Sequence, residues 1–129
     1  MLLVKTILRE TKNKGIGLFA DEFLSAGKKM WVNELFFTIE FEKVIIDMFP
    51  PTAKEFIDKY AWTEDGETFW VNLDNERFVN HSETPNAYYD KDTGDMFSYR
   101  DIEIGEEILV DYTSFDLSSK NNLGFEVKE

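Results

Sequence analysis

Short runs of β-compatible residues, separated by turn residues, make up most of this chain and limit the folds open to it. Residues 2–8 form the first such run, which is rich in Leu, Val, Ile and Thr. Further runs of this kind are found at 18–24, 30–32 and 35–41. An Asp-Gly pair at 65–66 and a polar turn within 87–99 each separate two runs that contain aromatic residues, which is typical of hairpins. The sequence therefore predicts a mainly β fold of short strands.

The stretch with a helical pattern lies in the middle of the chain. Residues 42–49 favour a short helix that stops at Pro50-Pro51. Thr52 and Glu55 have the spacing of a capping box, so we expect a second helix with Thr52 as its N-cap. Apolar residues then recur with the period of one helix face, which favours packing into a core. These residues are Ala53, Phe56, Ile57, Tyr60 and Ala61.

Composition narrows the class of protein. With 129 residues, of which 43% are hydrophobic, the chain suits one globular domain. It contains no cysteine, which excludes disulfides and thiolate metal sites and suits a reducing compartment. The apolar run at residues 1–5 is too short for a signal peptide or a membrane span, so we expect a cytoplasmic protein that binds no membrane.

The net charge is −12, whereas a nucleic-acid binder should present a basic face, so we expect no direct nucleic-acid partner. Acidity suits a basic polypeptide partner, because opposite charge raises the rate of encounter. It suits equally a protein that is merely soluble, and composition leaves both interpretations open.

The densest cluster of directed polar groups is the stretch 77–86, Arg-Phe-Val-Asn-His-Ser-Glu-Thr-Pro-Asn. It contains His81, the single histidine of the chain, and a half-apolar run delivers this histidine to a fixed place. Pro85 favours extended geometry at Thr84 and ends any helix. Taken alone, the stretch also fits a capped turn in which Asn80 and Ser82 bind local backbone.

Two further stretches extend the pattern. Residues 105–112, Gly-Glu-Glu-Ile-Leu-Val-Asp-Tyr, read as a turn and a short strand that ends in a tyrosine. Residues 14–20, Lys-Gly-Ile-Gly-Leu-Phe-Ala, contain two glycines that permit a tight backbone path. Taken in chain order, the stretches 14–20, 77–86 and 105–112 resemble the cofactor loop and the two signature motifs of the SET domain, the protein-lysine methyltransferase family.

The resemblance implies a fold and a division of the chain. The expected fold is mainly β with a small helical insert, built from several short curved sheets with a knot-like C-terminal arrangement. Residues 1–129 would form a single SET domain. Its variable insert would cover approximately residues 42–70, and its C-terminal tail approximately residues 113–129.

The resemblance also implies roles for particular residues. The cofactor would be S-adenosylmethionine, with no metal. Tyr112 would be the catalytic tyrosine, whose hydroxyl orients the lysine amine at the methyl-transfer pore. Asn80 would bind the amino-acid end of the cofactor, and His81 would meet the adenine largely through its backbone. The remaining residues implied to contact the cofactor are Lys14, Gly15, Ile16, Gly17, Arg77 and Phe78. The apolar residues next to the motifs, Phe78, Val79, Ile108 and Leu109, would lie in the core.

On the substrate side, the resemblance brings Tyr60, Trp62, Val110 and Phe115 to the channel that admits lysine. Glu83 stands where many members of the family have cysteine, and the cysteine-rich modules that flank many SET domains are absent from this sequence. Another group must then close the cofactor site, and Phe115 or Phe125 is our candidate. A homodimer is one way to complete the substrate groove.

The expected activity is S-adenosylmethionine-dependent methyl transfer to a lysine side chain, within a basic segment of a protein substrate. Such a reaction needs positioning and an uncharged amine rather than extensive acid–base machinery. An alternative is a non-catalytic SET-like module that binds basic peptides. A hydrolase with His81 as base is disfavoured, because the chain has neither cysteine nor a Gly-x-Ser-x-Gly elbow.

Overall fold

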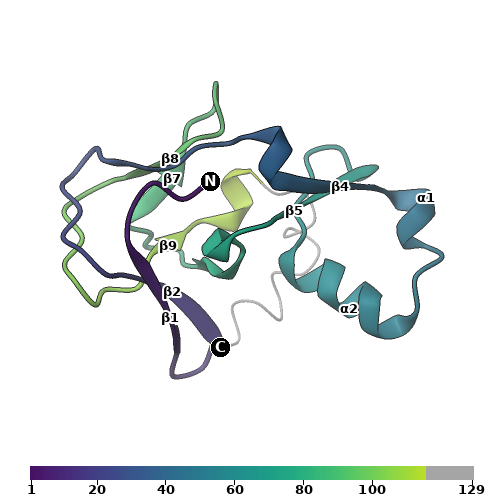
Figure 1. Cartoon of the computed structure of the whole chain (residues 1–129), viewed down its shortest axis with the longest axis horizontal. Helices are drawn as coiled ribbons and strands as arrows, with labels where there is room; N and C mark the ends of the chain where they lie inside the picture. The colour runs from purple at the N-terminus through teal and green to yellow at the C-terminus, as the bar shows by residue number, and fades with distance from the viewer. Residues whose placement is uncertain (116–129) are drawn as a thin grey trace.

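The computed structural model describes residues 1–115, and its elements are short strands gathered into four small sheets (Figure 1). The strands are β1 (Thr6–Glu10), β2 (Ile16–Ala20), β3 (Lys29–Trp31), β4 (Thr38–Glu42), β5 (Thr68–Asn72), β6 (Asn80–His81), β7 (Ala87–Tyr89), β8 (Met96–Ser98) and β9 (Leu109–Val110). The helices are α1 (Lys43–Ile46) and α2 (Pro51–Tyr60), with 3-10 turns η1 (Leu35–Phe37), η2 (Asn75–Phe78) and η3 (Tyr112–Ser114). The mainly β prediction is confirmed.

Strands β1 and β2 form an antiparallel hairpin that carries the glycine loop at its turn. Gly15 has φ +73°, a conformation that glycine adopts without a steric penalty. The Thr11 hydroxyl closes the turn, because it accepts from the Lys14 N–H and donates to the Gly15 carbonyl. Strand β1 begins and ends later than the predicted run at 2–8, since pairing with β2 carries it through to Glu10.

The helical insert is a small body at one end of the molecule, with α1, α2, β4 and β5 together on the right of Figure 1. The prediction that Thr52 caps α2 is wrong. The helix begins at Pro51, and Pro50 is its N-cap, with no side-chain cap. A proline at the first helical position has φ already set and lacks only an N–H that would have had no partner. The insert has its own hydrophobic cluster, formed by Ile46, Ile57, Ala61 and Val71.

The main core lies under the other three sheets. Its fully buried side chains come from strands and loops across the chain and include Leu18, Leu24, Met30, Met96, Ile102 and Ile108. Of the residues predicted to be core, Val79 and Ile108 are buried, whereas Phe78 and Leu109 are half-buried. Within residues 1–115, no helix has the length and apolar character needed to cross a membrane.

Candidate active site

A two-residue parallel pair, β6 with β9, brings the two predicted motifs together. Asn80 lies opposite Leu109, and His81 lies opposite Val110. Buried Asn86 locks this register: its Nδ2 donates to the Glu107 carbonyl (2.8 Å), and its Oδ1 accepts from the Leu109 N–H (2.9 Å). The Asn86 backbone N–H also donates to the Leu109 carbonyl (3.1 Å). The Asn-His-Ser stretch and the Asp-Tyr stretch are consequently held as one unit.

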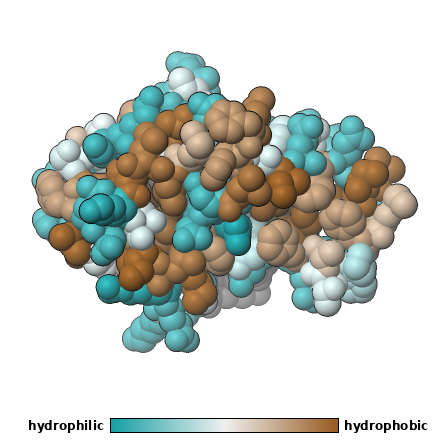
Figure 2. Space-filling view, in the orientation of Figure 1, coloured by the Kyte–Doolittle hydropathy of each residue, from teal (hydrophilic) through white to brown (hydrophobic). Residues whose placement is uncertain are grey.

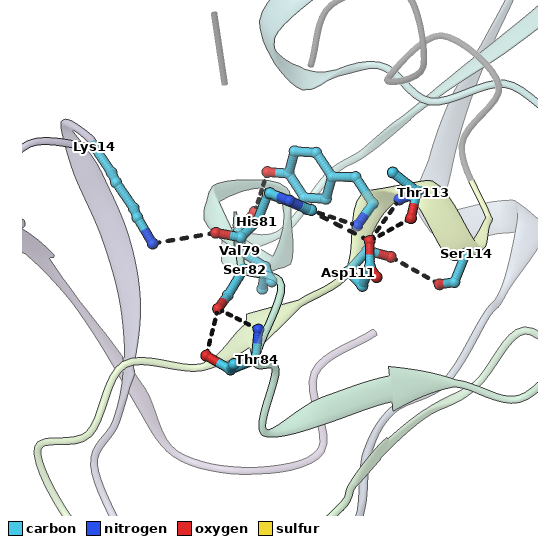
Figure 3. Close-up of polar contacts among 9 residues, drawn as sticks. Lys14, Val79, His81, Ser82, Thr84, Asp111, Thr113 and Ser114 are labelled. Carbon is cyan, nitrogen blue, oxygen red and sulfur yellow. Dashed lines mark hydrogen bonds and ion pairs between the residues drawn. The ribbon is translucent and has the colours of Figure 1, made fainter. Parts of the chain in front are cut away.

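His81 is buried in this unit and bonded to the second motif. Its Nδ1 accepts from the Tyr112 N–H at 3.0 Å, so in this arrangement the ring is neutral and carries its proton on Nε2. The Asp111 carboxylate lies 3.7 Å from the same Nδ1, a contact that becomes an ion pair only if Nδ1 is protonated and the Tyr112 bond is given up (Figure 3). Nε2 is buried with no hydrogen-bond partner among the described residues.

Tyr112 follows β9, at the start of η3. Its hydroxyl donates to the Val79 carbonyl at 2.5 Å, and its ring centroid lies 5.3 Å from that of His81. Two bonds to the other motif, one from the backbone and one from the hydroxyl, therefore fix the direction of the tyrosine. This is the preorganisation that an orienting hydroxyl requires.

The glycine loop contacts the same unit through Asn80. The Asn80 Nδ2 donates to the Glu107 carboxylate (2.8 Å) and to the Ile16 carbonyl (3.2 Å). A Cβ added at Gly17 would lie 2.5 Å from Glu107 Oε2 and 3.1 Å from Asn80 Nδ2, so only glycine leaves room for this pair. Sequence reasoning missed Glu107 as the partner of Asn80.

Lys14 reaches across from the loop to β6. Its Nζ donates to the His81 carbonyl at 3.1 Å (Figure 3). The predicted cofactor residues of the loop, from Lys14 to Gly17, thus lie beside Asn80 and His81.

A cavity of about 550 Å³ opens on the other side of Tyr112. This volume is within the range of small-molecule sites. Predicted site residues on its wall are Tyr60, Trp62, Arg77, Tyr112 and Phe115. Val110 is not on the wall, because its side chain is buried in the main core. Phe78 is also set back, and its ring packs on that of Tyr60 with centroids 5.3 Å apart.

Phe115 connects the walls of this cavity. Its ring centroid lies 4.6 Å from that of Tyr89, 6.1 Å from that of Tyr112 and 6.5 Å from that of Trp62. Phe125, the other candidate for closing the cofactor site, lies outside the described residues.

Comparison with protein families identifies this arrangement. The model of the SET domain matches residues 15–113, which include the glycine loop, the Asn-His-Ser stretch and Tyr112. The chain belongs to the SET domain family. A crystal structure of a Plasmodium falciparum protein, described as a candidate histone methyltransferase, superposes on this SET domain with a TM-score of 0.60. The two share 19% sequence identity, and the match covers 86% of this chain and 95% of the other. No curated protein matches the sequence.

One polar group of this SET domain was not anticipated from its sequence. Glu76, on η2, is 3% exposed and lines the cavity. Its carboxyl group accepts hydrogen bonds from the Tyr89 hydroxyl and the Asn72 amide. Burial raises the pKa of Glu76 from 4.5 to about 8, although the two hydrogen bonds act to lower it. Burial also raises the pKa of Tyr89 well above its usual value.

Proposed function

We propose that this SET domain transfers a methyl group from S-adenosylmethionine to a lysine side chain of a protein substrate. The observation that carries the proposal is the place of Tyr112. It bonds His81 and Val79 on one side, and it lines the aromatic cavity on the other. One residue thus touches both the part of the site assigned to the cofactor and the part assigned to the amine.

The residues assigned to the cofactor fit such a group. Gly15 is exposed with open space beside it, whereas Gly17 is buried against Glu107 and Asn80. His81 Nε2 is a buried donor with no partner among residues 1–115. When bound, S-adenosylmethionine supplies an electrophilic methyl group on a sulfonium. Asn80, already held against the loop, would bind its amino-acid end, and the His81 backbone would meet its adenine.

The cavity supplies what a lysine acceptor needs. Free lysine has a pKa of about 10.4 and is almost entirely charged at pH 7. Aromatic walls disfavour the ammonium by desolvation and so lower the pKa of the bound amine. Six aromatic residues lie on the wall here, together with polar and charged residues: Trp31, Tyr60, Trp62, Tyr89, Tyr112 and Phe115. Tyr112 would orient the nitrogen, because its own direction is fixed by two hydrogen bonds.

The net charge of the chain, −12, supports a basic segment as substrate, whereas the cavity wall carries both signs, with Lys59, Arg77 and Lys91 among its residues. Three further carboxylates, those of Glu64, Asp90 and Asp92, lie on the wall nearer to solvent than Glu76. They would meet positive residues that flank the target lysine.

Calorimetry with S-adenosylmethionine, followed by methylation of a panel of basic lysine peptides, tests the proposal. We expect specific cofactor binding by the wild type and by Tyr112→Phe, with turnover lowered about tenfold to a thousandfold in the variant. Tyr99→Phe is the matched control, because Tyr99 is 59% exposed and lies outside the cavity. Peptide binding without cofactor binding would instead favour the non-catalytic module. A protein that binds neither the cofactor nor a peptide would refute both functions.

A further inference from the structure

A carboxyl group buried in the cavity wall has no role in the function proposed above. Glu76, Asn72 and Tyr89 come from η2, β5 and β7, and all three line the cavity. The Tyr89 hydroxyl and the Asn72 amide both point their hydrogens at the Glu76 oxygens. The cluster is therefore a built polar site in a cavity whose wall also carries aromatic rings and, nearer to solvent, charged residues.

The cluster lacks a cation. None of the ion pairs among residues 1–115 involves Glu76, although a carboxylate is almost never fully buried without a partner. The charged groups that act on it are Asp74 and the Met1 amino group, while Lys59, Arg77 and Lys91 lie elsewhere on the cavity wall. None of these three bonds it: Arg77, for instance, donates to the Leu73 carbonyl.

A second atom of the cluster is unpaired. Asn72 Oδ1 is buried with no hydrogen-bond partner in the described part of the chain. Because the two ends of an amide are assigned from their surroundings, Asn72 can turn and offer this oxygen to a proton on Glu76. The site thus has a ready partner for the acid form of Glu76, and its raised pKa of about 8 agrees with this. The group can hold a proton, and it can release one in the range where enzymes work.

We propose that Glu76 binds the acceptor amine in this cavity and takes its proton, an inference that rests on the methyl transfer proposed above. The ammonium N–H bond breaks, its electron pair stays on nitrogen, and the proton forms an O–H bond with the carboxylate. Both charges disappear, so the cavity holds a neutral acid and a neutral amine. Tyr89, bonded to the same carboxylate, positions it for this exchange.

The first experiment measures binding of n-butylammonium, which reproduces the end of a lysine side chain, by NMR titration at pH 9. The wild type should bind it about tenfold or more tightly than Glu76→Gln, as expected for loss of a charge-assisted hydrogen bond. Glu55→Gln makes the same charge change on the exposed side of α2 and should bind as the wild type does. Equal affinity in Glu76→Gln and the wild type overturns the proposal.

The second experiment follows methyl transfer to the best peptide of the panel between pH 7 and pH 10. The wild-type rate should level off above the pKa of Glu76, about 8. The rate of Glu76→Gln should be about a hundredfold lower at pH 8, and should climb about tenfold per pH unit as lysine itself loses its proton. Parallel profiles would refute the role of Glu76 while leaving the methyltransferase intact.

A third measurement serves if Glu76→Gln fails to fold. Tyr89→Phe removes a hydrogen bond that favours the charged carboxylate, so the rising limb of its rate profile should move to higher pH. If the rising part of the Tyr89→Phe rate profile lies at the same pH as in the wild type, the proposal is contradicted. Absence of cofactor binding and of methyl transfer in the wild type would refute the proposed function instead, and the n-butylammonium titration would still decide whether Glu76 binds an amine.

Discussion

The buried carboxyl group of Glu76 should make the stability of the protein fall as the pH rises. Below pH 4.5 the group is protonated in both the folded and the unfolded chain. Between 4.5 and about 8 the folded chain keeps the proton and the unfolded chain loses it, so each step of rising pH shifts the equilibrium towards the unfolded chain. Above that range both states are ionised, and the folded state bears the full cost of a buried charge. The stabilisation present at low pH is thus lost through pH 8.

The size of the effect follows from the two pKa values. At roughly 1.4 kcal/mol per unit, the change from 4.5 to about 8 corresponds to about 5 kcal/mol. A domain of this size is stable by only about 5–15 kcal/mol, so the loss should be plain. In urea unfolding, the free energy falls by about 1–3 kcal/mol per molar urea. A loss of about 5 kcal/mol therefore lowers the midpoint urea concentration by about 2 M or more.

The assay is urea unfolding of the wild type and of Glu76→Gln at intervals from pH 5 to pH 9. The wild type should lose most of this stability between pH 5 and pH 8, while the variant should show a much flatter curve. Both proteins keep every other titrating group, such as the Met1 amino group, whose pKa burial lowers. The difference between the two curves therefore belongs to Glu76. Curves that run parallel over the whole range would refute the burial argument.

Four further outcomes are expected. Tyr112→Phe should lower turnover about tenfold to a thousandfold with little change in cofactor affinity; a wild-type rate across pH 7–10 would remove Tyr112 from catalysis. Asn80→Ala should weaken S-adenosylmethionine binding about tenfold to a hundredfold by calorimetry, and unchanged affinity would make Asn80 a turn residue only. Several hundred millimolar salt should weaken capture of a basic peptide, because exposed charges are then screened within a few ångströms; equal reaction of neutral and basic peptides at all salts would contradict this. The expected homodimer should give twice 15.1 kDa in light scattering, and Phe36→Glu, on a 73% exposed side chain of η1, should reduce it to the monomer; a wild-type monomer at every concentration would exclude the dimer.

Its exposed apolar side chain makes Phe36 a sensible probe of association, and Figure 2 shows one face of the molecule. Apolar side chains gather on this face of the molecule, some of them over the insert. The most exposed large apolar residues of η1 and α1 are Leu35, Phe36 and Val44, and Met48 follows α1. These side chains would be covered first if two copies met through the insert.

Features that depend on a few neighbouring residues could be predicted from the sequence. The turn at Asp65-Gly66 is one, because the Asp65 carboxylate accepts from the Glu67 and Thr68 N–H groups, and glycine supplies φ +77°. The three motifs, in their order, were sufficient to predict the family. They also contain the residues that the fold brings together around β6 and β9. The roles of those residues remain predictions.

Features that depend on distant contacts could not be predicted in this way. Buried Glu76 on η2 is bonded by Tyr89 from β7, and nothing in the letters Asp-Asn-Glu-Arg separates this glutamate from a surface acid. The inward direction of Val110 follows from the parallel register with β6, which the sequence does not reveal. The Thr52 capping box failed for a local reason, since the helix has Pro50 as its N-cap and so starts two residues earlier.

The parallel pairing of β6 and β9 also governs the order in which the molecule can fold. The β1–β2 and β7–β8 pairs each join strands that follow one another through a short turn, and such hairpins form within microseconds. The β6–β9 pair must instead close a loop that contains β7 and β8, and this loss of chain entropy comes before any gain from contact. Asn80, His81 and Tyr112 therefore meet only in the late, non-local stage of folding. In a refolding experiment, the capacity to bind a cofactor should lag behind the formation of strands, and a chain released before residue 112 would contain most of the sheets but no site.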